Sequence, residues 1–156
     1  MQRITHAGQI ESAKIQQLFV YWQSKCSNGS IPRRRDISPT EILPILPHIL
    51  MVDFEQSPFR VRFRLVGTKV VEITGFEFTG RYLDEIAGAE DRQPFHECYE
   101  IASKSEAPVM TRITWRFDQE TTGDYDFCVL PLESDGQVAS MAIAIECYER
   151  LRKRYT

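Results

Sequence analysis

Apolar residues alternate with arginines along residues 59–65, so that four apolar side chains share one face and three arginines share the other. This period of two predicts a strand with one buried face. At Gly67 the period changes, and the apolar spacing that follows is typical of a short helix, which Gly75 can end. We therefore expect a strand that runs directly into a helix and forms one corner of the domain.

Similar patterns predict further strands at residues 50–55, 109–117, 125–132 and 140–148. The last of them is apolar on both faces, with Met141, Ile143 and Ile145 opposite Ala142 and Ala144. Burial on both faces indicates a central strand. Between the second and third strands the chain shows short helical patterns, and a longer one covers residues 91–105.

The beginning of the chain contains a second kind of pattern. Residues 1–8 show no periodicity, and we expect them to be frayed. From about residue 11 to 25, large apolar side chains recur at helical spacing, namely Ile15, Leu18, Phe19 and Trp22. This apolar stripe could cover the chain's own sheet or pack against a second copy. We predict a homodimer interface through these four residues, with docking on the own sheet as the alternative.

Three regions follow from these patterns. Residues 1–30 form an N-terminal helical extension, residues 31–148 form the main domain, and residues 149–156 form a basic tail that is helical or frayed. A chain of 156 residues is long enough for one domain with a substantial core.

Several short blocks of sequence resemble a bacterial PAS-like family, PAS family 5. They are Ile31–Ile42, Leu46–His48, Phe63–Thr68, Gly75, Thr79–Arg81, Val129–Leu132 and Asp135–Gly136. The resemblance implies an α+β fold with a five-stranded antiparallel sheet in the order 2-1-5-4-3 and short helices on one face. It also implies a role in sensing or in protein–protein signalling, without implying a particular ligand.

In such a fold, the concave face of the sheet and the short helices enclose a cavity. Its candidate walls, which would also serve as ligand-binding residues, are Phe63, Leu65, Tyr82, Phe95, Tyr99, Ile113, Trp115, Phe127 and Met141. Tyr82, Tyr99 and Trp115 could offer hydrogen bonds to a ligand. The same side chains could instead fill the core.

Composition excludes some classes of function. With 19 basic and 22 acidic residues the net charge is −3, so no global charge favours nucleic acid. No apolar run reaches the roughly 20 residues of a membrane span, and the N-terminus lacks the apolar core of a secretion signal. The four cysteines have no C-x-x-C pair and indicate reduced thiols. We expect a cytoplasmic protein.

Chemistry-bearing motifs are scarce. The histidines are scattered, so we predict no metal site and no catalytic residue. The sequence contains no stretch that resembles the flavin-binding segment of light-sensing PAS domains, and we favour no cofactor. The predicted function is a sensor or adaptor that acts through a signalling protein partner and binds a small molecule in its cavity. Two alternatives stay open: a small α+β enzyme that uses His96, Cys98 and Tyr99, and a structural interaction module with a filled core.

Overall fold

The computed structural model describes residues 1–86, 88–116, 119, 121–149 and 154–155. With η for a 3₁₀ helix, the elements in chain order are β1 (Gln2–Arg3), η1 (Ala7–Gln9), α1 (Ala13–Lys25), η2 (Arg34–Asp36), η3 (Pro39–Glu41), η4 (Leu43–His48), β2 (Ile49–Glu55), β3 (Arg60–Val66), α2 (Thr68–Thr74), α3 (Leu83–Ile86), α4 (Ala89–Ser105), β4 (Val109–Arg116), β5 (Thr121–Ser134), β6 (Gln137–Cys147) and β7 (Arg154–Tyr155).

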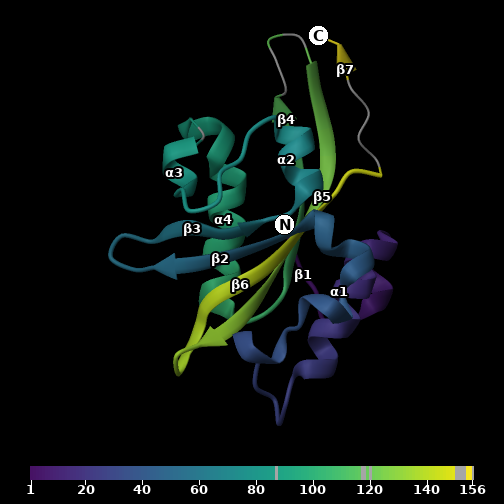
Figure 1. The fold of residues 1–156 in the computed structure, drawn as a ribbon, viewed down its shortest axis with the longest axis vertical. Helices are drawn as coiled ribbons and strands as arrows, with labels where there is room; N and C mark the ends of the chain where they lie inside the picture. Colours follow the sequence, from purple (N-terminus) through teal and green to yellow (C-terminus); the bar gives the residue numbers. More distant parts are fainter. Residues whose placement is uncertain (87, 117–118, 120, 150–153, 156) are drawn as a thin grey trace.

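The strands form one antiparallel sheet in the order β1-β4-β5-β6-β2-β3, and β7 pairs with the start of β5 (Figure 1). Strands β2 to β6 are the five predicted strands, and they lie in the predicted order. Strand β6 is central, between β5 and β2, and every residue from 141 to 147 is buried. The apolar pattern on both faces of residues 140–148 therefore predicted the central strand correctly.

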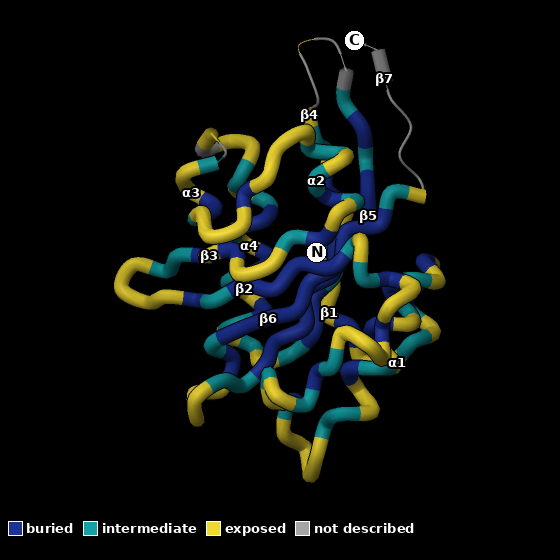
Figure 2. The backbone as a smooth tube through the Cα atoms, in the orientation of Figure 1, coloured by how far each residue is buried: buried dark blue, intermediate teal, exposed yellow. Residues whose placement is uncertain are grey.

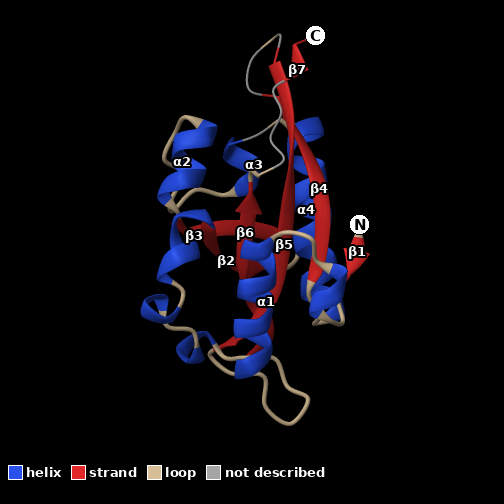
Figure 3. Ribbon diagram, turned by 90° about the vertical axis from the view of Figure 1, so that its right-hand side faces the viewer, coloured by secondary structure: helices blue, strands red, loops and turns tan. Residues whose placement is uncertain are grey.

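We predicted that residues 1–8 are frayed, but the first of them form a strand. Gln2 and Arg3 pair with Met110 and Val109 and form strand β1 at the edge of the sheet, beside β4 (Figure 3). Ile4 follows with a buried side chain, and its backbone N–H donates to the Pro108 carbonyl at 3.0 Å. Pairing with β4, this hydrogen bond and the buried Ile4 side chain all tie the segment to the sheet, and a two-residue strand is too short to show a period.

The sheet separates two apolar cores, because helices cover both of its faces. Helices α2, α3 and α4 pack on one face, and α1 with the 3₁₀ helix η4 packs on the other (Figures 1 and 3). Helices α2, α3 and α4 lie on one face, as the resemblance implies for the short helices, but the short helix η4 lies with α1 on the other. Along β6, Ala142 and Ala144 belong to the α4 side, whereas Met141, Ile143 and Ile145 belong to the α1 side. Figure 2 shows the buried strands between the two helical layers.

Helix α1 docks on the sheet of its own chain. The four residues of the predicted dimer interface, Ile15, Leu18, Phe19 and Trp22, are all at most 6% exposed within the single chain. The Trp22 indole N–H also donates to the Pro131 carbonyl at 2.9 Å. This burial contradicts the predicted interface, because these side chains already pack in their own core and cannot also meet a second helix. The alternative, docking on the own sheet, is the arrangement observed.

A β-bulge in β3 changes the predicted faces of that strand. Val52 pairs with Phe63 and Met51 with Leu65, so Arg64 is an extra residue in the ladder. Phe63 stays in the core on the α4 side. Beyond the bulge the faces exchange, and Leu65 lies on the α1 side with 37% of its surface exposed. The prediction that Leu65 lines the cavity is therefore wrong.

The end of the chain is described in part. Arg154 and Tyr155 pair with Thr122 and Thr121 as β7, so this segment is a strand and not the helical or frayed tail that we predicted. Residues 150–153 and 156, the rest of that tail, lie outside the described residues, and so does Phe117, the last residue of the strand predicted at 109–117.

Candidate functional site

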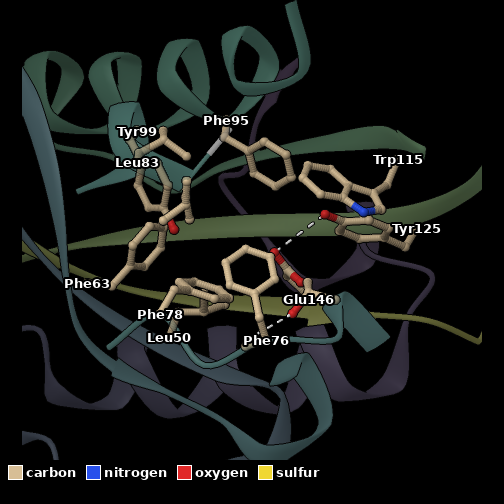
Figure 4. Close-up of a pocket in the computed structure, with 12 residues that line it drawn as sticks. Leu50, Phe63, Phe76, Phe78, Leu83, Phe95, Tyr99, Trp115, Tyr125 and Glu146 are labelled. Carbon is tan, nitrogen blue, oxygen red and sulfur yellow. Dashed lines mark hydrogen bonds between the residues drawn. The ribbon is translucent and has the colours of Figure 1, made fainter. Parts of the chain in front are cut away.

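A small pocket lies between the sheet and helices α2, α3 and α4 (Figure 4). Its walls are mainly aromatic rings, from Phe63, Phe76, Phe78, Phe95, Trp115 and Tyr125, with Leu50, Leu83 and Ile86 between them. The enclosed volume is about 30 Å³, room for about one or two water molecules. The core on this face is therefore incompletely filled.

The rings hold one another in edge-to-face contacts. Phe63 meets Phe78 with ring centroids 4.7 Å apart and planes at 83°, and Phe95 meets Trp115 at 5.8 Å and 76°. Phe95 and Tyr99 are four residues apart on α4, so both point from the same side of the helix toward the sheet. Such pairs stabilise beyond their buried area and fix the shape of the pocket walls.

A buried carboxyl group, that of Glu146 on β6, faces this pocket. Only 4% of the residue is exposed. The Tyr125 hydroxyl donates to one carboxylate oxygen at 3.5 Å, and the Tyr148 hydroxyl donates to the other. Burial raises the pKa of Glu146 to about 7, while the two tyrosine hydrogen bonds act to lower it. Within the described part of the chain, no basic side chain forms an ion pair with this carboxylate.

A second polar atom in the pocket is the hydroxyl of Tyr99. It is buried, and no hydrogen-bond partner for it exists among the described residues. Burial and the nearby Glu146 carboxylate raise the pKa of Tyr99, so the hydroxyl keeps its proton. An unpartnered buried hydroxyl costs about 1–3 kcal/mol unless a water or ligand satisfies it. Apart from its carboxylate, the pocket therefore contains a hydroxyl that no described residue pairs with.

His48 and Tyr148 close the site behind Glu146. The Nδ1 atom of His48 lies 3.0 Å from the backbone oxygen of Glu146, and the imidazole packs against the Tyr148 ring at 5.8 Å. Desolvation lowers the pKa of His48. The imidazole is thus held by the backbone at Glu146 and not by its carboxylate.

The structure divides the predicted cavity walls into three groups. Phe63, Phe95, Tyr99 and Trp115 line the pocket, while Ile113 and Phe127 lie in the same core without lining it. Three predicted wall residues lie elsewhere: Leu65 and Met141 on the α1 side, and Tyr82 outside, where the Arg60 guanidinium lies 3.7 Å from its ring centroid.

Sequence reasoning missed the acid at the centre of the site. Glu146 continues the series Ala142, Ala144 on one face of a strand predicted to be buried on both sides. A carboxylate at such a position rarely occurs without a function or a partner. That signal was present in the sequence, but only the sheet order shows that the small-residue face of β6 meets Tyr99 and Tyr125.

The residues of the enzyme alternative do not converge. Tyr99 lines the pocket, but the His96 imidazole pairs with Glu100 at 3.4 Å and packs against Phe59. The Cys98 thiol points to the Val109 carbonyl, and burial raises its pKa to about 12. Among the described residues, no group of three metal-ligating side chains is close enough to hold a metal ion, and no helix is long and apolar enough to cross a membrane.

Known proteins resemble this fold, and their sequences are distant. A light-oxygen-voltage (LOV) domain studied with a flavin analogue aligns with a TM-score of 0.52 and 10% identity, over 69% of this chain and 83% of that one. The Rhodobacter sphaeroides LOV protein gives 0.49 and 11%, over 64% of this chain and only 57% of its own length. A fungal LOV photoreceptor gives 0.49 and 14%, over 87% and 94%.

The sequence comparisons are more specific than the structural ones. A search of curated protein sequences found no significant match. A model of the PAS domain family PAS_5, however, matches residues 10–145, which include α1 and every residue that lines the pocket except Glu146. The protein therefore belongs to this family of PAS domains.

Proposed function

We propose that this domain is a cytoplasmic sensor that binds a small molecule in the pocket beside Glu146 and signals by changing its association with a protein partner. One observation carries the proposal: a carboxylate and an unpartnered hydroxyl are buried together in an otherwise apolar, aromatic pocket. Apolar pockets with a few convergent polar groups are the usual form of small-molecule sites.

A flavin, the ligand that one LOV comparison mentions, does not fit these residues. Pockets that bind drug-sized ligands and cofactors have volumes of about 300–1,000 Å³, whereas this pocket encloses about 30 Å³. The Cys98 thiol is buried against β4 and is not part of the pocket wall. The ligand of this domain is therefore smaller and of another kind.

A change in the pocket has a short path to the other face of the sheet. Glu146 and Tyr148 contact each other on the pocket side. The next residue, Glu149, accepts hydrogen bonds at 3.0 Å from both the Ser12 hydroxyl and the Lys14 ammonium, at the start of α1. The end of β6 thus joins the pocket to α1, and the exposed side of α1 is the surface that we assign to the partner.

The test is to purify the protein from its host and measure its native mass and absorbance spectrum. We expect a bound small molecule without a haem or flavin band. Leu83→Phe, which adds volume to the pocket wall, should lose that mass, whereas Leu43→Phe, an exposed leucine away from the pocket, should keep it. Two results together would refute the proposal. The wild-type protein from its host carries no small molecule, and no compound in a small-molecule library stabilises the wild-type protein more than it stabilises the Leu83→Phe variant.

A further inference from the structure

The chemistry of the pocket restricts what it can bind. Glu146 is the only charged residue among its described lining residues, and no lysine, arginine or histidine lines it. A carboxylate accepts about four hydrogen bonds. Tyr125 and Tyr148 supply two, and the one from Tyr125 is long at 3.5 Å. The carboxylate therefore has acceptor capacity that the described residues leave unused.

The Tyr99 hydroxyl can also accept a hydrogen bond from a ligand. The Tyr99 hydroxyl lines the same cavity and has no partner among the described residues. Its oxygen can accept a hydrogen bond while its proton turns toward a second acceptor. A ligand group with several N–H donors can donate to Glu146 and to Tyr99 at the same time, whereas a single hydroxyl has one proton and can donate to only one of them.

The aromatic walls favour a positive charge as well. Rings of Phe76, Phe78, Phe95, Trp115 and Tyr125 surround the cavity near Glu146 (Figure 4). The face of an aromatic ring attracts a cation, by about 2 kcal/mol or more when the cation is desolvated. An anion would instead meet the buried carboxylate and no compensating charge from the described residues.

Building on the proposed function, we propose that the ligand is a small organic ammonium ion, with its N–H groups on Glu146 and Tyr99 and an apolar body about the size of one ring.

The size follows from Phe76. An apolar cavity of about 150 Å³ is needed for benzene, so the enclosed 30 Å³ must widen before a ring can enter. Phe76 is part of the pocket wall yet 41% exposed, and it follows Gly75, whose φ of 87° is in the left-handed region. When its ring turns outward, it vacates the space of one ring next to Glu146.

The experiment uses three compounds of one shape: benzylamine (protonated at pH 8), benzyl alcohol and benzoate. Their binding to the wild-type chain and to Phe76→Ala is measured by calorimetry at pH 8. In Phe76→Ala, we expect benzylammonium to bind at least about tenfold more tightly than benzyl alcohol, since hydrogen bonds to charged groups are the stronger ones. Benzoate should not bind.

Two further variants in the Phe76→Ala background locate the ammonium group. Glu146→Gln should remove the preference for benzylammonium and leave the affinity for benzyl alcohol within about threefold, because the apolar contacts remain. Tyr99→Phe should weaken benzylammonium more than benzyl alcohol. In the wild-type chain the same order of affinities is expected with all binding weaker, because Phe76 must first move.

The outcomes separate this inference from the proposed function. If benzyl alcohol binds as tightly as benzylammonium, or if Glu146→Gln leaves the preference intact, the ammonium assignment is wrong while the pocket remains a binding site. If none of the three compounds binds either protein, the ammonium assignment fails. If, in addition, the protein from its host carries no small molecule, the proposed function fails with it.

Discussion

Replacing Glu146 with glutamine should make the protein more stable at pH 8 and leave its stability nearly unchanged near pH 4. Glutamine has almost the same shape and cannot ionise, so the variant removes the cost of a buried charge. The groups that face this carboxyl are the hydroxyls of Tyr99 on α4, Tyr125 on β5 and Tyr148 directly after β6, and His48 contacts the backbone behind it. Hydroxyls can donate or accept, so they can adapt to the amide.

The magnitude follows from the raised pKa. The carboxyl titrates at 4.5 when the chain is unfolded and at about 7 in the fold. Between these values the folded state holds one more proton than the unfolded state, so stability falls as the pH rises. One pKa unit corresponds to about 1.4 kcal/mol, so the wild-type protein should lose about 3 kcal/mol between pH 4 and pH 8 through this group.

The assay is urea unfolding at several pH values from 4 to 8, with the free energy of unfolding compared between Glu146→Gln and the wild type. His48 contributes the opposite slope, because its pKa is lowered in the fold, but it is present in both proteins and cancels in the difference. The control is Glu90→Gln, an exposed glutamate in the first turn of α4. If the two curves for wild type and Glu146→Gln run parallel with pH, the carboxyl is not desolvated and the account of the site is wrong.

Two further substitutions test the fold around the site. Gly67→Ala should destabilise the protein by more than about 2 kcal/mol in chemical denaturation, because a Cβ at this position would overlap the Pro47 carbonyl. The control is Gly88→Ala, whose Cβ would meet nothing within 4 Å and which should change stability by less than about 0.5 kcal/mol. Equal effects of the two substitutions would contradict the close approach of α2 to η4. Leu18→Asp should destabilise the isolated domain by more than about 3 kcal/mol, because it buries an unpaired charge between α1 and the sheet. Val20→Asp, on the exposed side of the same helix, should be nearly neutral, and a Leu18→Asp protein as stable as Val20→Asp would show that α1 does not dock on its own sheet.

The sheet could be predicted from the sequence because its signal is local. Alternation identified the five main strands, and the two-sided apolar pattern of residues 140–148 identified the central one. Strand order came from the resemblance to PAS domains, since period alone does not say which strands are neighbours. A period also assumes a regular ladder, and the extra residue Arg64 broke that assumption and turned Leu65 to the other face.

The partner of α1 could not be predicted, because an apolar stripe looks the same whether it meets a sheet or another helix. The structure shows that the stripe packs on the sheet of its own chain, because its side chains are buried there and the Trp22 indole N–H donates to the Pro131 carbonyl. The role of Glu146 could not be predicted for a different reason. Its position among alanines on a buried strand was visible, but its tyrosine partners come from β5 and from the end of β6, and only the folded sheet brings them together.

The geometry of a strand places Glu146 close to both faces of the sheet. Neighbouring residues of β6 point to opposite faces, so Glu146 faces the pocket while Cys147 lies in the core beneath α1. In the proposed sensor, a proton or a ligand cation at Glu146 would change the hydrogen bond to Tyr148, and Tyr148 is next to Glu149, which binds the first turn of α1. Because that first-turn contact is an exposed ion pair worth about 1 kcal/mol or less, small changes at the pocket can shift it. If the domain acts as the sensor proposed above, this weak contact at the end of a buried strand is where we expect its signal to reach α1.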